Sequence, residues 1–191
     1  MSIPTKDKVM ESQYHGQKNY RSKIHEKVFF EAIKHLNFKG TTVLDVGAGN
    51  GWCGKEFKRR NAKKVILTDI MPLNKEILKM DMTQLKFKDE TFDFVNCHGS
   101  LHHVKHPTRA LKELSRVLKP QGILILTGEA ILEGSWIKTH FNRYFQYIYL
   151  RFNNPEEWKA GGRNYLANEY VSWCASANLK KIKEGIYKKN E

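Results

Sequence analysis

Four short segments of the chain are rich in apolar and β-branched residues, and stretches with helical periodicity separate them. These segments are predicted to be strands, at residues 41–46, 64–68, 92–96 and 123–127. Strands that are apolar along their length must be covered on both faces, which is typical of a parallel sheet between two layers of helices. The chain is therefore predicted to form a doubly wound, mostly parallel α/β sheet, with its ligand beyond the carboxyl ends of the strands.

Three helices are predicted around these strands, at residues 22–36, at residues 52–60 and from Pro107 onward, where proline suits a first helical turn. The apolar positions of the first are Ile24, Val28, Ala32 and Leu36, with Phe29 and Ile33 beside them. Those of the third are Ala110, Leu111, Leu114, Val117 and Leu118. Pro120-Gln121-Gly122 is predicted to turn the chain into the strand at 123–127.

Length and composition favour one ordinary domain, because the chain has 191 residues of which 40% are hydrophobic and 28% are charged. Residues 1–10 contain no apolar run, so no signal peptide is expected. The three cysteines are too few and too widely spaced for a zinc cluster or a disulfide framework, so reduced thiols and a cytoplasmic location are expected. The net charge of +13 comes from scattered lysines, which favours a solvated surface over a nucleic-acid patch.

A glycine-rich turn joins the first predicted strand to the second helix. Gly47, Gly49 and Gly51 allow a backbone to approach a ligand closely and to adopt positive φ. Gly49-x-Gly51-x-x-Gly54 also fits the dinucleotide fingerprint, with Asp69 about 20 residues downstream of the turn. On this pattern alone, a nicotinamide enzyme and a turn that only lets helix and strand pack closely both remain open.

The glycine turn belongs to the first of several motifs that occur in a fixed order along the chain. They are Val43-Leu44-Asp45-Val46-Gly47-Ala48-Gly49-Asn50-Gly51, Asp81-Met82, Leu85 to Val95, Leu101-His102-His103-Val104 and Arg116-Val117-Leu118-Lys119-Pro120-Gln121-Gly122. From Ile24 to Thr127 the chain resembles class I S-adenosylmethionine-dependent methyltransferases, in the branch that includes ubiquinone and menaquinone biosynthesis enzymes. The resemblance implies a Rossmann-like fold with S-adenosylmethionine as methyl donor and S-adenosylhomocysteine as product, and it favours this interpretation over a dehydrogenase.

The resemblance also implies roles for individual residues. Asp45 would hold the cationic amino group of the donor, and Asp69 would accept from its ribose diol. The turn residues Gly47, Ala48, Gly49 and Gly51 would face the methionine half through their backbone. The other implied contacts are Ile70, Met71, Asp81 and Met82 around adenine, and Cys97 and His98 near the methyl group.

Three histidines, His98, His102 and His103, crowd the segment after the fourth predicted strand. Methyl transfer needs a base only if the acceptor must lose a proton, and histidine titrates near neutral pH. His98 and His102 are therefore the candidate catalytic residues, and His103 is expected to be structural. No spacing of carboxylates or cysteines completes a metal site around them.

The sequence departs from the family pattern in two places. Residues 70–80 are too few for the usual helix and strand, so the helix is expected to be missing or reduced to a turn, with residues 76–80 as the strand. At the end of the chain, a helix at 168–177 and one strand at 179–187 leave four residues, too few for another strand. We therefore expect either a sheet lacking the last of seven strands or a fragment, and an exposed edge that favours a homodimer.

As a single methyltransferase domain, the chain divides into a helical cap (1–40), a donor-binding core (41–127), an acceptor-side aromatic segment (128–170) and a terminal helix and strand (171–191). The aromatic segment favours a small-molecule or lipid-like acceptor beneath a lid, but peripheral membrane contact and RNA stacking fit its basic and aromatic residues too. Two alternatives to a small-molecule enzyme thus stay open, namely an RNA methyltransferase and a non-catalytic binding or scaffold protein.

Overall fold

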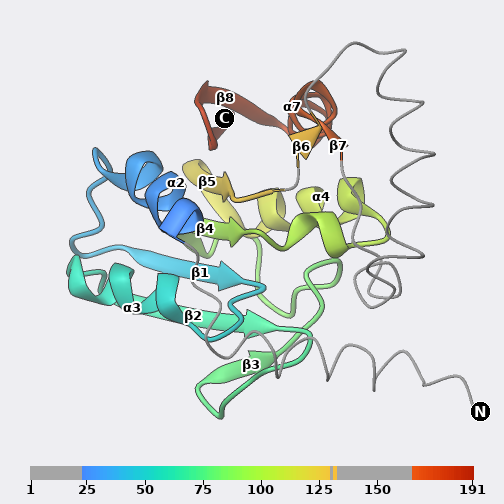
Figure 1. Cartoon of the computed structure of the whole chain (residues 1–191). Helices are drawn as coiled ribbons and strands as arrows, with labels where there is room; N and C mark the ends of the chain where they lie inside the picture. The colour runs from blue at the N-terminus through green and yellow to red at the C-terminus, as the bar shows by residue number, and fades with distance from the viewer. Residues whose placement is uncertain (1–22, 130, 133–164) are drawn as a thin grey trace, which may run out of the picture.

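A seven-stranded sheet lies at the centre of the computed structural model, which describes residues 23–129, 131–132 and 165–191 (Figure 1). The strand order is β3-β2-β1-β4-β5-β9-β8. The first five of these strands are parallel, whereas β9 runs antiparallel to β5 and β8 antiparallel to β9. The strands are β1 (Thr42–Val46), β2 (Lys64–Asp69), β3 (Ile77–Lys79), β4 (Phe92–His98), β5 (Leu118–Thr127), β8 (Leu179–Lys183) and β9 (Ile186–Lys189).

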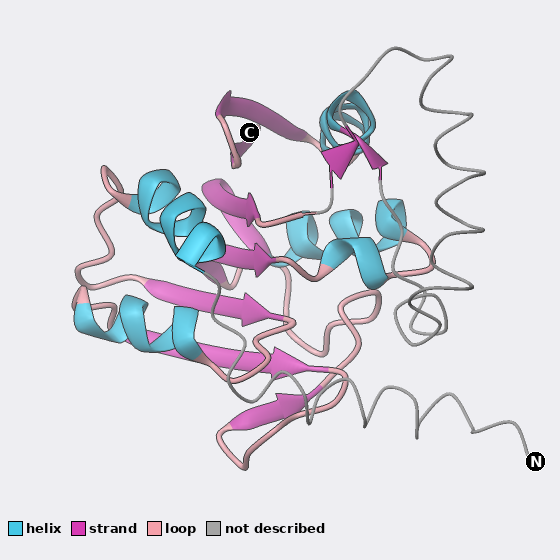
Figure 2. Cartoon of the chain, in the orientation of Figure 1, coloured by secondary structure: helices cyan, strands magenta, loops and turns pink. Residues whose placement is uncertain are grey.

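Helices cover both faces of the sheet, as Figures 1 and 2 show. Helices α2 and α3 lie on one face, and α4 and α7 lie on the other. A second sheet of two short parallel strands, β6 and β7, joins the start of α7. The bounds are α2 (Lys23–Ile33), α3 (Trp52–Arg59), η2 (Leu101–His103), α4 (Pro107–Val117), β6 (Ile131–Leu132), β7 (Tyr165–Leu166) and α7 (Ala167–Ser176).

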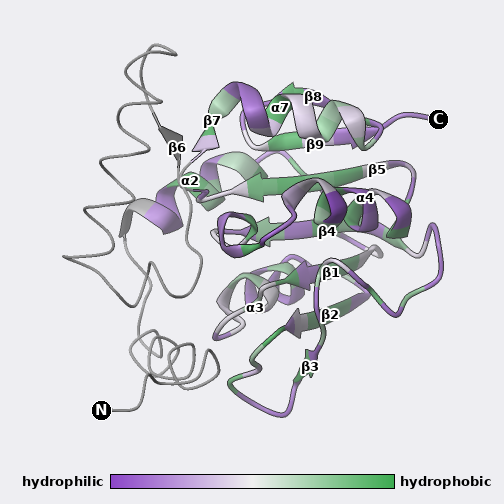
Figure 3. Cartoon of the chain, turned by 90° about the vertical axis from the view of Figure 1, so that its right-hand side faces the viewer, coloured by the Kyte–Doolittle hydropathy of each residue, from purple (hydrophilic) through white to green (hydrophobic). Residues whose placement is uncertain are grey.

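Successive residues of the central strands contribute to two separate cores. Val43 and Phe94 pack with α2 and α3, whereas their neighbours Leu44 and Val95 pack with α4 and α7. Figure 3 shows the hydrophobic colour running along β5 between these layers. Because a strand alternates its side chains between faces, both faces of such strands must be apolar. The predicted doubly wound architecture is confirmed.

The short connection between β2 and β3 is also as expected. Residues 70–76 form bends and turns without a helix, and only residues 77–79 pair as a strand. The backbone N–H of Met80 donates to the carbonyl oxygen of Asp69 over 2.8 Å, which draws the end of β3 against the end of β2. Ile70 is 42% exposed, so this side of the sheet is open.

The expectation of a missing seventh strand is wrong. Residues 179–189 form two strands and a turn, because Glu184-Gly185 reverses the chain between β8 and β9. Gly185 has a φ of +69°, and a Cβ atom there would lie 2.6 Å from Cγ2 of Thr127. A hairpin with so short a turn needs few residues, which the sequence argument did not allow for. The sheet therefore has seven strands, and the argument for a dimer from a missing strand falls away.

Three smaller expectations also change. The segment 120–122 does not precede β5 but lies within it, where Gln121 has a φ of +62° and the pairing with β4 shifts its register. Cys97 and His98 are the last two residues of β4 and do not lie in the loop after it. On α2 the buried residues include Phe29 and Ile33, whereas Val28 is 42% exposed.

Most of the predicted aromatic segment, including the stripe Ile137, Phe141, Tyr144, Ile148 and Phe152, lies outside the described residues. Within the part of the chain that is described, no helix is long and apolar enough to cross a membrane.

Candidate functional site

The turn between β1 and α3 is built from three glycines with left-handed backbone conformations. The φ angle is +62° at Gly47, +54° at Gly49 and +78° at Gly51, a region that other residues rarely adopt. At Gly47 a Cβ atom would lie 2.5 Å from Cβ of Ser100, whereas at Gly49 it would meet nothing within 4 Å. The turn therefore packs tightly against the segment after β4 at Gly47 and faces open space at Gly49.

Asp45 is a buried carboxylate one residue before the end of β1. Its Oδ1 accepts a 2.7 Å hydrogen bond from Nδ2 of Asn96, whereas its Oδ2 accepts none from the described residues. Burial raises the pKa of Asp45 to about 7, the charge of nearby Asp69 adds to this, and Asn96 and the Gly54 amide partly oppose it. A buried acceptor without a donor is costly, so this oxygen is suited to a cation or donor supplied by a ligand.

Asp69, at the end of β2, ties the glycine turn to the next loop. Its Oδ2 accepts from the backbone N–H of Gly49 and its Oδ1 accepts from that of Met71, both over 2.9 Å. The residue is only 1% exposed. A carboxylate can accept several hydrogen bonds at once, which is the chemistry that a diol requires.

The predicted adenine-side residues are more exposed. Oδ1 of Asp81 accepts from the backbone N–H and the hydroxyl of Thr83, over 2.7 and 2.8 Å, so the carboxylate closes its own turn. Met82 packs on the main core, and its Cε lies 3.5 Å from the position that a Cβ on Gly47 would occupy. Met82 thus borders the glycine turn, whereas no hydrogen bond joins Asp81 to it among the described residues.

Cys97 and Ser100 close the site on the β4 side. The Sγ of Cys97 lies 3.2 Å from Oγ of Ser100, and Ser100 in turn contacts the carbonyl of Val46 over 3.4 Å. Burial raises the pKa of the Cys97 thiol well above its usual range, and the charge of Glu129 raises it further. Cys97 is therefore a neutral packing residue and not a nucleophile.

His98 lies in an aromatic cluster formed by residues of α2 and α3. Its ring centroid lies 5.3 Å from that of Trp52, 5.6 Å from that of Phe29 and 5.7 Å from that of His25. Nδ1 of His98 is 2.8 Å from Oγ1 of Thr127, and Nε2 is buried without a partner among the described residues. Burial lowers the pKa of His98 to about 4, which makes it a weak base at neutral pH.

His102 has a different environment, set by a residue that the sequence interpretation missed. Glu129 follows β5, and its side chain is only 3% exposed. Its carboxylate accepts from the backbone N–H groups of Ser100, Leu101 and His102, over 2.9–3.1 Å, and lies 2.9 Å from Nδ1 of His102. A carboxylate on Nδ1 fixes the ring and leaves Nε2 as the proton acceptor. The sequence did contain a signal for Glu129. This acid follows shortly after a buried strand, and Asp45 and Asp69 likewise lie at or next to the ends of their strands.

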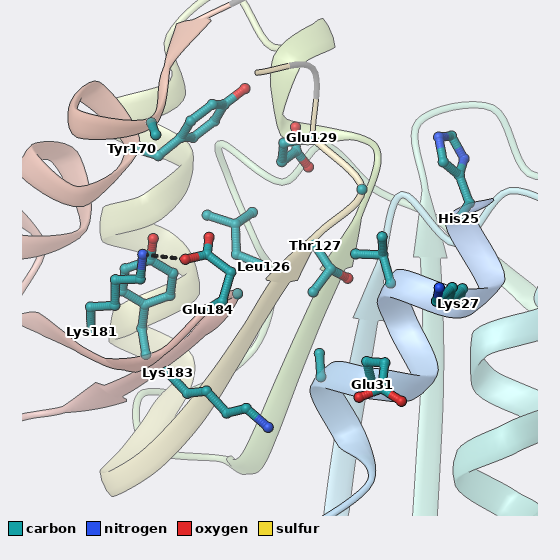
Figure 4. A pocket seen from close by; sticks show the side chains of 16 residues that line it. His25, Lys27, Glu31, Leu126, Thr127, Glu129, Tyr170, Lys181, Lys183 and Glu184 are labelled. Carbon is teal, nitrogen blue, oxygen red and sulfur yellow. Dashed lines mark hydrogen bonds and ion pairs between the residues drawn. The ribbon is translucent and has the colours of Figure 1, made fainter. Parts of the chain in front are cut away.

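A cavity of about 690 Å³ lies beside Glu129, away from the glycine turn. The cavity is lined by α2, the end of β5, the start of α7 and the β8–β9 hairpin, as Figure 4 shows. Its volume lies in the range of small-molecule sites. Apolar and aromatic side chains, among them Ala32, Leu126, Tyr170 and Tyr187, form part of its wall.

Comparison with known proteins gives a consistent answer. A family model described as a methyltransferase domain matches residues 44–126. A demethylmenaquinone methyltransferase of Listeria monocytogenes is 33% identical over 148 residues, which cover 66% of this chain and 61% of that protein. A ubiquinone/menaquinone biosynthesis C-methyltransferase of Laribacter hongkongensis is 34% identical over 106 residues, 46% of this chain and 42% of that protein. Residues 44–126 therefore belong to the methyltransferase domain family. The chain spans about three fifths of the length of the first of these relatives.

Solved structures support the methyltransferase fold. The YcgJ protein of Bacillus subtilis superposes with a TM-score of 0.67 at 21% identity, over 83% of this chain and 71% of that one. The 1,6-didemethyltoxoflavin-N1-methyltransferase of Burkholderia thailandensis, which was solved with 1,6-didemethyltoxoflavin and S-adenosylhomocysteine, has a TM-score of 0.66 at 14% identity. That match covers 100% of this chain and 92% of the other. Both show that the methyltransferase fold is present.

Within this methyltransferase fold, the structure brings together only part of the predicted site. The glycine turn and Asp69 are hydrogen-bonded, and Cys97 contacts the turn through Ser100. The two candidate catalytic histidines diverge, because His98 faces α2 and α3 whereas His102 contacts Glu129.

Proposed function

We propose that this protein transfers a methyl group from S-adenosylmethionine to a small-molecule acceptor. The observation that carries the proposal is the Asp45 carboxylate, which is buried at the glycine turn with one oxygen that no described residue satisfies. The donor has a cationic amino group, which is the partner that such an oxygen lacks. The relatives of this chain are named as methyltransferases, which supports methyl transfer as the reaction.

The other predicted donor contacts fit the same ligand. The backbones of Gly47, Ala48, Gly49 and Gly51 would lie against the methionine half, since a Cβ at Gly49 would enter open space. Asp69 would accept from the ribose diol, and the exposed Ile70 with Met71 would form an apolar wall for adenine. Asp81 and Met82 would complete the adenine side, and Cys97 would line the donor near its sulfonium.

When bound, the donor supplies an electrophilic methyl carbon, and the protein supplies alignment and exclusion of water. We propose that His102 accepts a proton from the acceptor, because Glu129 holds its Nδ1 and leaves Nε2 available. His98, whose pKa is about 4, is less suited to that role, although Thr127 fixes its orientation.

The acceptor would enter the cavity beside Glu129, which is large enough for a small or lipid-like molecule. Names of relatives refer to menaquinone and ubiquinone biosynthesis, which agrees with an acceptor of that size. RNA and membrane contact rested on the aromatic segment outside the described residues, and the scaffold alternative rested partly on a missing strand that is present. None of these three is part of the proposal.

The proposal is tested by calorimetric titration of the purified protein with S-adenosylmethionine and S-adenosylhomocysteine. We expect micromolar binding that Asp69→Ala weakens by about 100-fold, since each hydrogen bond to a charged group contributes about 1.5–3 kcal/mol. A matched control is Asp89→Ala. Asp89 is an exposed acid that forms an ion pair with Arg116 and is not among the predicted donor contacts. If neither compound binds, the protein is not a methyltransferase of this kind.

A further inference from the structure

The carboxylates that line the cavity have partners among the described residues, whereas two of its lysines do not. Three glutamates line it, and each already has a partner among the described residues. Glu31 lies 2.7 Å from Nζ of Lys34, and Glu184 lies 2.6 Å from Nζ of Lys181. Glu129 accepts three backbone N–H groups and contacts His102. The carboxylates of the wall are therefore compensated without a ligand.

Two of the three lysines at the cavity are not compensated in this way. Lys27 comes from α2 and Lys183 from β8, and neither has an ion pair or hydrogen bond with a residue that the structure describes. Figure 4 shows Lys183 extending from the hairpin toward α2, on which Lys27 and Glu31 lie. Both ammonium groups act on Glu31, whose pKa they lower after the larger effect of its bond to Lys34. Two positive charges thus approach one cavity from opposite walls.

The rest of the wall limits what can bind. Ala32, Leu126, Tyr170 and Tyr187 offer apolar and aromatic surface, and the cavity holds about 690 Å³. An inorganic anion would leave that surface in contact with water, whereas a neutral apolar molecule would leave the lysines without a partner. A molecule with an apolar body and one acidic group satisfies both features.

We propose that the cavity binds an amphipathic small acid, with its carboxylate, sulfonate or phosphate between Lys27 and Lys183, and that this acid is the methyl acceptor. Only the statement that this acid is the methyl acceptor rests on the proposed function. The specificity follows from the chain's own charges: a neutral quinone would gain nothing from the two lysines, but an aromatic acid of similar size would.

The test is a fluorescence titration of the full chain with 8-anilino-1-naphthalenesulfonate and with its uncharged analogue N-phenyl-1-naphthylamine. We expect the sulfonate to bind about tenfold more tightly than the amine, and this advantage to be lost in Lys27→Gln/Lys183→Gln. The control Lys39→Gln/Lys180→Gln removes the same charge from exposed lysines that do not line the cavity, and should keep the advantage. Lys27→Arg/Lys183→Arg should also keep it, and near-UV circular dichroism checks that each variant is folded.

Equal binding of the two dyes, or an unchanged advantage in the glutamine variant, overturns the proposal. So does binding to phosphatidylglycerol vesicles that the glutamine variant loses while its dye affinity stays unchanged, since the lysines would then serve a lipid surface. Donor binding measured by calorimetry separates the two claims: dye binding without donor binding supports the acid site and overturns its role as acceptor site. If the dye inhibits methylation of small acids in an extract, the result supports both the acid site and its role as the acceptor site.

Discussion

The two ends of this site are built in opposite ways. At the glycine turn, Asp45 and Asp69 are each 1% exposed, and backbone amides and Asn96 hold them in place. At the cavity, Lys27 and Lys183 are exposed side chains on separate elements, around an apolar wall. The first end is rigid and allows little change in its ligand, whereas the second can change its ligand by exchanging a few surface residues.

The largest effect is expected at His102, which Glu129 of the cavity wall holds in place. His102→Ala should lower methyl transfer by about 10²–10⁴-fold, because it removes the proposed base. Donor affinity should change little. The measurement is transfer of tritiated methyl groups into a small-molecule extract that the wild-type protein methylates.

His103→Ala is the matched control, since His103 lies next to His102 and burial lowers its pKa to about 4. An equal loss of transfer in both variants would contradict a specific role for His102. It would indicate that the whole 3₁₀ helix η2, which contains both histidines, had been disturbed.

The tightness of the glycine turn is tested by comparing two alanine substitutions. Gly47→Ala should lower the free energy of unfolding by about 3 kcal/mol, because left-handed strain adds to a collision with Ser100. Gly49→Ala carries only the strain, about 1 kcal/mol, but its methyl group would enter the space assigned to the donor. Urea unfolding and donor calorimetry should therefore rank the two variants in opposite orders, and the same order in both would refute an open ligand space at Gly49.

Glu129 lines the cavity and also holds the segment after β4, so its substitution should affect stability more than that of another cavity glutamate. Glu129→Gln removes the charge that three backbone N–H groups and His102 share, and should cost about 2 kcal/mol of unfolding free energy. Glu31→Gln loses one exposed contact with Lys34 and should have no measurable effect. Urea denaturation compares them, and equal midpoints would show that Glu129 does not anchor the turn after β4.

The smallest predicted effect is a pH dependence of donor binding. Burial raises the pKa of Asp45 to about 7, so the folded protein without ligand holds a proton there that the unfolded chain releases near pH 4. Its stability therefore falls as pH rises from about 4 to about 7. A cationic amino group requires the ionised carboxylate, so donor affinity should rise with pH, by about tenfold between pH 5.5 and 7.

That window lies below the titration of an α-amino group, at about 7.7–8.0, so the ligand's own charge stays constant. Asp45→Asn should bind the donor weakly and without this pH dependence. Calorimetry in buffers of different ionisation enthalpy should also detect a proton released by the wild-type protein alone. A flat pH profile in the wild type would mean that Asp45 does not contact the cation.

The contrast between the two ends explains how much could be predicted from sequence. The glycine turn, Asp45 and Asp69 lie at ends of apolar strands, so short-range patterns located them, and the absent helix between β2 and β3 followed from counting residues. The cavity unites α2, β5, α7 and a hairpin that lies near the other end of the described sequence from α2, and no local pattern joins such distant segments. The hairpin itself was missed because Glu184-Gly185 was interpreted as part of a strand.

The lysines of β8 have a further consequence, for contacts between copies of the chain. Among the described residues β8 is the last strand of the sheet, and one row of its backbone N–H and C=O groups has no strand partner there. Natural sheets discourage edge-to-edge association by placing lysines on such strands, and β8 has the sequence Leu-Lys-Lys-Ile-Lys. Acetylation of these lysines, or their replacement by apolar residues, would remove that repulsion and leave Ile182, already 53% exposed, at the centre of an aggregation-prone edge.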